Sequence, residues 1–297
     1  MGFVRIFGME YFRGIPQHLR EHGYTVHTPL VHPTASISIR AKQILDYLDE
    51  QAIDEPVHIV AHSMGGLDAR YLASPNGLDQ GHRILTITTI GTPHYGTRIA
   101  SLAWFCGMYR LSILRPIPSV NLHKLDDETQ RFYREIRDSE WTGLYELTPI
   151  FLKASFNPGI LDHPNVHYFS FAGKMVGIDG APLWAPLALQ WAYLRVMEGA
   201  NDGLVSIDSC KWRQFVRVLP ASHQDLIGHL YPRTKIPFNR FDFYRELVEG
   251  LGRVERGDLK TLSAQFSDPV DTAHGTNFTG PRSPEGSGSQ DEASNGL

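Results

Sequence analysis

The 297-residue chain has few cysteines, little net charge and no long apolar run. Its two cysteines, Cys106 and Cys210, lie far apart, and neither belongs to a CxxC or a Cys/His spacing of the kind that binds metals. This excludes a cysteine-based metal centre and a disulfide-rich scaffold. A single disulfide between Cys106 and Cys210 remains open.

The charge balance excludes a second class of protein, the strongly basic nucleic-acid binders. The chain holds 28 basic and 32 acidic residues, a net charge of −4. A nucleic-acid binder that depends on a strongly basic body is therefore excluded. The whole deficit lies in residues 266–297, which contain five acidic residues against Arg282 alone, so residues 1–265 are neutral by formal count.

The longest nearly uncharged stretches, 99–109 and 181–194, are shorter than the roughly 18 to 20 residues that span a bilayer. We therefore expect no transmembrane segment. Arg5 and Glu10 stand where a secretory signal would need an apolar run, so the chain as given shows no signal peptide. Localisation stays open.

Apolar periodicity predicts strands at 56–61, 83–90, 166–172 and 215–219, and helices at 38–51 and 65–72. Alternating strands and helices indicate an α/β fold, a mostly parallel sheet with helices on both faces. We expect one domain over residues 1–252, with inserts at about 99–150 and 174–199. Residues 253–297 are expected to form a mostly disordered tail, because Gly, Ser, Pro, Asn, Thr and acids dominate from residue 267 on.

The most informative stretch places a serine between a predicted strand and a predicted helix, in Ala61-His-Ser63-Met-Gly65. Small residues two positions before and after Ser63 allow the sharp turn of a nucleophile elbow. Such a turn exposes the hydroxyl at a helix N-terminus, where backbone N–H groups favour a developing negative charge. A plain Ser-Gly turn is the structural alternative.

A nucleophilic serine needs a histidine base and an acid that orients it. In α/β-hydrolases the acid follows the serine along the chain and the histidine follows the acid. The candidates in this order are Asp202, in an Asn-Asp-Gly turn, and His223, which follows the predicted strand 215–219. The Asn-Asp-Gly triplet is also a good tight turn in its own right. His229 is a rival base, but its apolar spacing favours a packing role.

These residues resemble the α/β-hydrolase lipases of the bacterial triacylglycerol lipase type. The resemblance rests on AHSMGGLDAR, IGTPHYGT, NDGLV and SHQDLIG, at residues 61–70, 90–97, 201–205 and 222–228. It implies Ser63 as nucleophile, Asp202 as triad acid and His223 as base.

The resemblance also implies that the backbone N–H of Met64 forms half of an oxyanion hole. It places His62, His94 and Tyr95 at the lining of the cleft. For His94 we expect cleft lining rather than a direct chemical role.

The chain departs from the family pattern at its start. Members carry an apolar strand ending in His-Gly, followed by a residue whose N–H is the second oxyanion donor. That motif aligns here with Met1-Gly2-Phe3, so Phe3 is the expected donor and the preceding strand is missing. Losing that strand would expose unpaired edges, so we expect a truncated or misassigned start. An authentic short protein with an oxyanion hole weakened by about 10² to 10³ in kcat is the alternative.

Two apolar stretches, 101–114 and 182–194, fall in the inserts, the first where such lipases carry a lid. They indicate acyl-chain binding or contact with a lipid–water interface; core helices are the alternative. We therefore predict a carboxylic-ester hydrolase of lipid degradation, a lipase on acylglycerols. An acyltransferase or phospholipase with the same triad is a second interpretation, and a non-catalytic lipid- or protein-binding relative a third.

No organic cofactor is required by this chemistry. Some relatives use a position matching Asp225 to bind a structural calcium ion, with Asp179 only a guess for a second ligand. Because a hard cation needs several oxygen ligands, one matched aspartate leaves the calcium site weakly supported.

Overall fold

The computed structural model describes residues 11–105, 142–175, 185–229, 238–257 and 266. All of them belong to one unit, which spans residues 1–266. None of the helices in this described part is long and apolar enough to cross a membrane.

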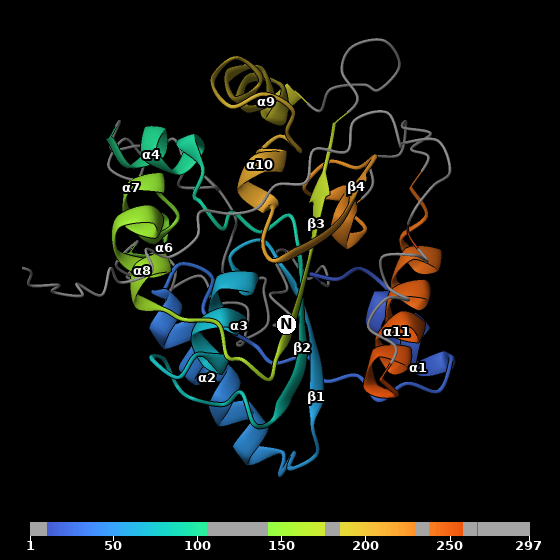
Figure 1. The fold of residues 1–297 in the computed structure, drawn as a ribbon. Coiled ribbons are helices and arrows are strands. Elements are labelled where there is room, and N and C mark those ends of the chain that lie inside the picture. The colour runs from blue at the N-terminus through green and yellow to red at the C-terminus, as the bar shows by residue number, and fades with distance from the viewer. Residues whose placement is uncertain (1–10, 106–141, 176–184, 230–237, 258–265, 267–297) are drawn as a thin grey trace, which may run out of the picture. The chain divides into compact units, whose positions relative to one another are not determined.

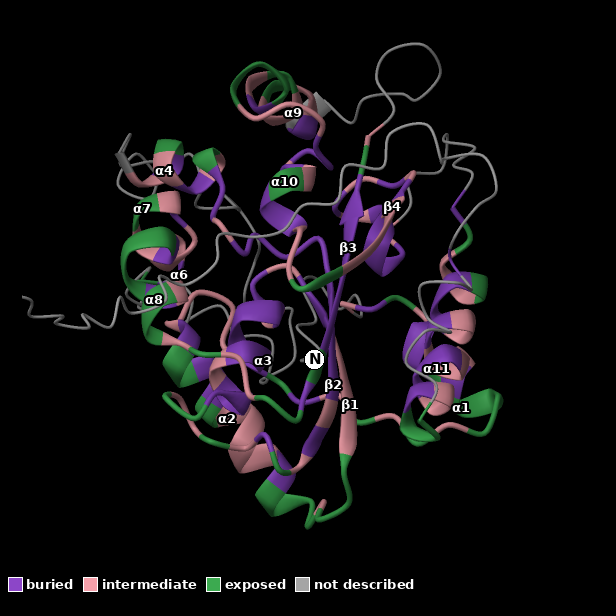
Figure 2. Ribbon diagram, in the orientation of Figure 1, coloured by how far each residue is buried: buried purple, intermediate pink, exposed green. Residues whose placement is uncertain are grey.

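The centre of the fold is a parallel sheet whose four described strands are neighbours in chain order (Figure 1). They are β1 (Val57–His62), β2 (Ile84–Ile90), β3 (His167–Gly173) and β4 (Gln214–Leu219). Each bound lies within one residue of the prediction. The middle strands β2 and β3 are buried almost throughout, as strands covered on both faces must be (Figure 2). The predicted mostly parallel α/β fold is confirmed.

One face of the sheet packs against α2 (Ile37–Glu50) and α3 (Gly65–Ala73). Helix α2 begins where the Ser36 side chain accepts a hydrogen bond from the Ile39 N–H. Its apolar residues Ala41 and Leu48 recur at helical spacing and face the core.

The opposite face packs against α1 (Ile15–Glu21) and α11 (Arg240–Glu255) (Figure 1). Phe243, Tyr244 and Leu247 of α11 join Phe169 and Phe171 of β3 in a second core. Helices therefore cover both faces of the sheet. This leaves the carboxyl ends of the strands as the place for a ligand site.

The shorter elements lie between the strands. They are α4 (Arg98–Phe105), α6 (Thr142–Glu146), α7 (Pro149–Phe151), the π-helix η2 (Leu152–Phe156), α8 (Asn157–Gly159), α9 (Ala185–Met197), α10 (Ile207–Cys210) and the 3₁₀-helix η3 (Asp225–Ile227). The predicted inserts at 99–150 and 174–199 therefore have helical parts, while residues 106–141 and 176–184 lie outside the described residues. The prediction of disorder likewise falls almost wholly outside them: beyond Gly257 only the buried Phe266 is described.

Candidate active site

Ser63 stands on a sharp turn between β1 and α3. It adopts a left-handed backbone conformation with φ of 54°, which a non-glycine residue holds only when its surroundings enforce it. The Ser63 N–H donates to the Ile90 carbonyl at 3.1 Å. The Thr92 hydroxyl donates to the Ser63 carbonyl at 2.8 Å. The strained turn is thus fixed from the end of the neighbouring strand β2.

Close approach of α3 to the strand β2 explains one of the glycines after the serine. A Cβ at Gly66 would lie 2.7 Å from Thr92 Cγ2 and 2.8 Å from Thr89 Cγ2, both too short for non-bonded carbons. At Gly65 the nearest atom to such a Cβ would be Ala61 Cβ at 3.9 Å, an ordinary contact. Gly66 is therefore the position at which the elbow requires a residue without a side chain.

Asp202 and His223 form a buried pair. Nδ1 of His223 lies 2.7 Å from Oδ2 of Asp202, and the His223 N–H donates to the Asp202 carbonyl at 2.9 Å. The other carboxylate oxygen, Oδ1, accepts the N–H groups of Leu204 and Val205 at 2.9 and 2.7 Å. Because both carboxylate oxygens are engaged, the acid has one orientation. Its bond to Nδ1 leaves Nε2 as the nitrogen available for proton transfer.

The end of β2 brings the serine and this pair to the same place. Gly91 has φ of 61°, and a Cβ there would lie 3.2 Å from Asp202 Oδ2 and 3.4 Å from His223 Nδ1. Ile90, next to it, is the residue whose carbonyl binds the Ser63 N–H. The ring of His62, next to Ser63, lies 4.4 Å from the ring of His223 between centroids. The Ser63 turn and the Asp202–His223 pair therefore lie near each other where parallel strands end, the usual place for a ligand site in such a sheet.

Met64 directly precedes α3, so its N–H belongs to the group of helix N-terminal donors without intrahelical partners. Its side chain is buried against Leu152 and Phe156 of the π-helix η2. Phe3, the other predicted oxyanion donor, lies outside the described residues.

The residues predicted to line the cleft differ in exposure. His94 is completely buried, with Nε2 3.0 Å from Thr89 Oγ1 and its ring stacked on Trp212 at 5.2 Å. Burial and the nearby Arg70 guanidinium hold the pKa of His94 well below its ordinary value. Tyr95 is half-buried beside the same Trp212. His62 is buried against His223.

Asp225 accepts the Ser222 N–H at 3.0 Å through Oδ2, and burial raises the pKa of its carboxyl. Among the described residues, no group of three or more His, Cys, Asp or Glu could hold a metal ion. Asp179 lies outside the described residues, and the calcium site stays a prediction. Cys210 is buried and free, while Cys106 lies outside the described residues.

Sequence reasoning missed the residues that support the site from a distance. Asp68 of α3 pairs with Arg40 of α2 at 2.7 Å. Arg70 lies over the Trp212 ring at 3.7 Å and reaches Asp162 at 3.3 Å. These partners are separated from Arg70 by about 90 residues or more, so no local spacing could reveal them.

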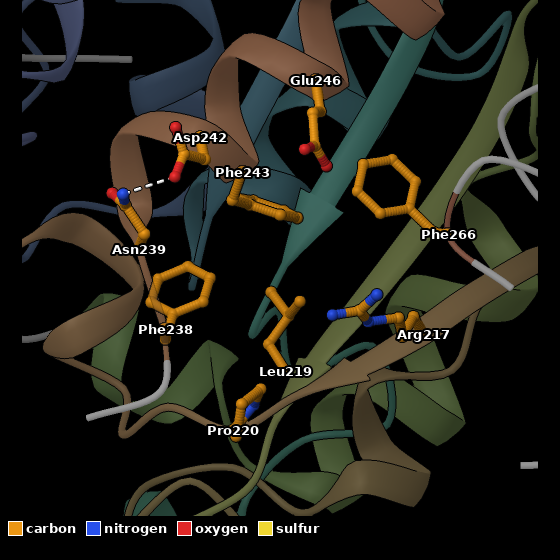
Figure 3. Close-up of a pocket in the computed structure, with 9 residues that line it drawn as sticks. All are labelled: Arg217, Leu219, Pro220, Phe238, Asn239, Asp242, Phe243, Glu246 and Phe266. Carbon is orange, nitrogen blue, oxygen red and sulfur yellow. Dashed lines mark hydrogen bonds between the residues drawn. The ribbon is translucent and has the colours of Figure 1, made fainter. Parts of the chain in front are cut away.

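A small cavity of about 160 Å³ lies on the α11 face of the sheet, bounded by Leu219, Phe238 and Phe243 among others (Figure 3). None of the three predicted triad residues lines it. We therefore do not assign it to the candidate active site.

Comparison with known proteins finds triacylglycerol lipases among the relatives. No protein-family model matches the chain. It is 30% identical over 279 residues to triacylglycerol lipase 2 of Saccharomyces cerevisiae, covering 90% of this chain and 75% of that protein. It is 26% identical over 288 residues to a triacylglycerol lipase of Pseudomonas fragi, covering 84% and 92% of the two chains.

Solved structures agree on the fold. A crystal structure of Staphylococcus hyicus lipase matches with a TM-score of 0.60 and 21% identity, over 84% of this chain and 92% of that one. One of Bacillus licheniformis lipase in its mature form matches with a TM-score of 0.57 and 20% identity, over 80% and 83%. From the length and identity of the match to the yeast lipase, the chain belongs to the triacylglycerol lipase family, and it is a hydrolase of the lipase and carboxylesterase class.

Proposed function

We propose that the chain hydrolyses acylglycerols through a Ser63–His223–Asp202 triad and an acyl-enzyme. The observation that carries the proposal is the buried 2.7 Å bond between His223 Nδ1 and Asp202 Oδ2, beside a serine held at positive φ. Few structural roles need a fully hydrogen-bonded carboxylate aimed at one nitrogen of an imidazole next to a strained serine.

The first half-reaction follows from the hydrogen bond between His223 and Asp202. Nε2 of His223 takes the proton of Ser63 Oγ while Oγ attacks the ester carbonyl carbon. Asp202 accepts the Nδ1–H throughout and stabilises the imidazolium that forms. The carbonyl oxygen becomes an oxyanion, which the N–H of Met64 binds, with Phe3 as the second donor that the family resemblance implies.

The intermediate collapses when the imidazolium gives its proton to the departing alcohol oxygen, leaving the acyl group on Oγ. Water then attacks the acyl carbon as Nε2 accepts its proton. The second collapse releases the fatty acid and returns the proton to Ser63. Atoms and charge balance without a cofactor.

The surface supports a lipid substrate over a small soluble ester. Most of the large apolar side chains that are exposed in the described residues lie on the insert helices, namely Leu102, Tyr145, Ile150, Leu189, Val196 and Met197. The others are Leu30, Ile39 and Leu161. Leu189 and Val196 of α9 are 80% and 85% exposed. Exposed apolar side chains on the inserts favour contact with an apolar surface. Since residues 1–265 carry no net formal charge, hydrophobic area rather than long-range attraction would drive that contact.

The test compares the full chain with Ser63→Ala and, as a matched control, with Ser38→Ala at an exposed helix position. Hydrolysis of p-nitrophenyl butyrate and of emulsified triolein is measured for each. We expect Ser63→Ala to lose at least 10³-fold in kcat on both, with Ser38→Ala unchanged. Equal rates for Ser63→Ala and the wild type would refute the triad. Activity on the soluble ester with none on triolein would make the enzyme an esterase, and faster transfer to an added alcohol than to water would make it an acyltransferase.

A further inference from the structure

Tyr11 lies at the junction of the two segments that carry the serine and the histidine. Its hydroxyl is 2.8 Å from Nδ1 of His62, the residue before Ser63. Its carbonyl accepts a hydrogen bond from His229 Nε2 at 2.8 Å. Two positions later in the chain, the Arg13 N–H donates to the Ile227 carbonyl at 3.0 Å. The segment 11–13 is therefore tied to the loop that follows His223 and to the end of β1.

His62 is held between Tyr11 and His223. Burial and the neighbouring His223 lower the pKa of His62 well below its ordinary value, so its ring is neutral near pH 7. Burial raises the pKa of Tyr11 to about 12, so the phenol keeps its proton. A protonated phenol and a neutral imidazole form this hydrogen bond in either direction, with the phenol O–H or the Nδ1–H as the donor. This bond fixes the rotation of the His62 ring.

The His62 ring lies against the His223 ring, 4.4 Å between centroids at an angle of 48°. Asp202 holds one edge of the His223 ring through Nδ1. The ring of His62 packs against the His223 ring as well, so a displacement of His62 leaves room for the His223 ring to shift. Both imidazoles are buried, at 3% and 6% exposure, so water does not replace either contact.

We propose that Tyr11 and His62 form a positioning pair, in which the Tyr11 hydroxyl orients the His62 ring and that ring holds the His223 imidazole in line with Ser63. The inference rests on the proposed triad. Neither residue touches the reacting atoms in this account; both act through the placement of His223. His229, which the sequence assigned to packing, contributes by anchoring the Tyr11 backbone to the loop after His223.

The experiment measures kcat and KM for p-nitrophenyl butyrate in Tyr11→Phe, His62→Phe and the double variant. Each substitution keeps an aromatic ring and removes one partner of the hydrogen bond. Because a small displacement of a catalytic group slows chemistry more than binding, we expect each single variant to lose about tenfold in kcat with KM within twofold. The double variant should be within twofold of the slower single variant, because the two side chains act as one unit.

Tyr168→Phe is the matched control. Tyr168 is also buried, and its hydroxyl takes part in one hydrogen bond of 2.8 Å, with the His163 N–H. We expect its kcat to stay within twofold of the wild type even where its Tm falls as far as that of Tyr11→Phe. If His62→Phe does not fold, Tyr11→Phe and the control alone decide.

Three results would overturn the pair: a Tyr11→Phe kcat within twofold of the wild type, a double variant that loses the product of the single losses, or an equal loss in Tyr168→Phe. Ser63→Ala separates this inference from the function on which it rests. If Ser63→Ala keeps wild-type activity, the triad fails and the pair with it. If Ser63→Ala is inactive while Tyr11→Phe is unaffected, only the pair is refuted.

Discussion

Alanine at two adjacent glycines should have opposite effects. A Cβ at residue 66 would overlap Thr92 and lie 2.8 Å from Thr89 Cγ2, whereas at residue 65 its nearest neighbour would be 3.9 Å away. Thr92 cannot retreat freely, because its hydroxyl holds the Ser63 carbonyl at 2.8 Å. Gly66→Ala must therefore displace either helix α3 or Thr92, whose hydroxyl fixes the turn at Ser63.

The magnitude follows from these contacts. Inserting one carbon into a filled site costs about 1 to 3 kcal/mol, and losing the Thr92–Ser63 hydrogen bond about 1 more. At about 2 to 4 °C per kcal/mol for a domain of this size, this total of about 2 to 4 kcal/mol should lower the Tm of Gly66→Ala by about 4 to 16 °C. A shift of about 1 Å in Ser63 would also lower kcat by about 100-fold. Gly65→Ala should keep its Tm or raise it slightly, since alanine favours helix by up to about 1 kcal/mol.

Differential scanning calorimetry gives both Tm values, and hydrolysis of p-nitrophenyl butyrate gives kcat. Measuring the two variants side by side controls for the general effect of a methyl group near the site. Equal Tm and equal kcat in Gly65→Ala and Gly66→Ala would refute the reasoning from close approach.

Three further predictions concern buried polar groups. Asp202→Asn should lower kcat on a soluble ester by about 10³ to 10⁴-fold, because the amide does not hold His223 in the required tautomer; a loss below tenfold in steady-state assays would contradict this. Arg70→Met should lower the free energy of unfolding by about 3 kcal/mol in urea titration, at the low end for a broken buried ion pair because Asp162 keeps two other donors. Burial is the main cause that lowers the pKa values of His62 and His94. Below about pH 6.5 the unfolded chain therefore binds protons that the folded chain does not bind, and the free energy of unfolding decreases as the pH is lowered. Each contributes a slope of up to about 1.4 kcal/mol per pH unit; His94→Gln should remove one such slope between pH 7 and 5, and an unchanged slope would show that His94 is not held neutral.

The sheet could be predicted from sequence because its cause is local. In β2 and β3, runs of Ile, Thr, Phe and Tyr specify buried strands over seven residues each, and the bounds follow within one residue. The elbow is equally local, since its strand, small residues and helix occupy one short stretch around Ser63. Parallel pairing then follows from the alternation of strands and helices.

The supports of the site could not be predicted because they join distant parts of the chain. Tyr11 reaches His62 across 51 positions, and Arg70 reaches Asp162 across 92. His94 belongs to a motif that suggests a cleft, yet stacking on Trp212 buries its ring completely. Which side chain fills the space beside another depends on packing that no sequence period encodes.

The central claim is that Ser63 is the nucleophile, and covalent labelling tests it most directly. The full chain and Ser63→Ala are each treated with an alkyl fluorophosphonate and digested. The masses of the serine-containing peptides are then measured by mass spectrometry. The account predicts one stoichiometric adduct, on Ser63, formed in parallel with the loss of esterase activity and absent from Ser63→Ala. An adduct on another residue that accompanies inactivation, or full inactivation with Ser63 unmodified, would contradict it.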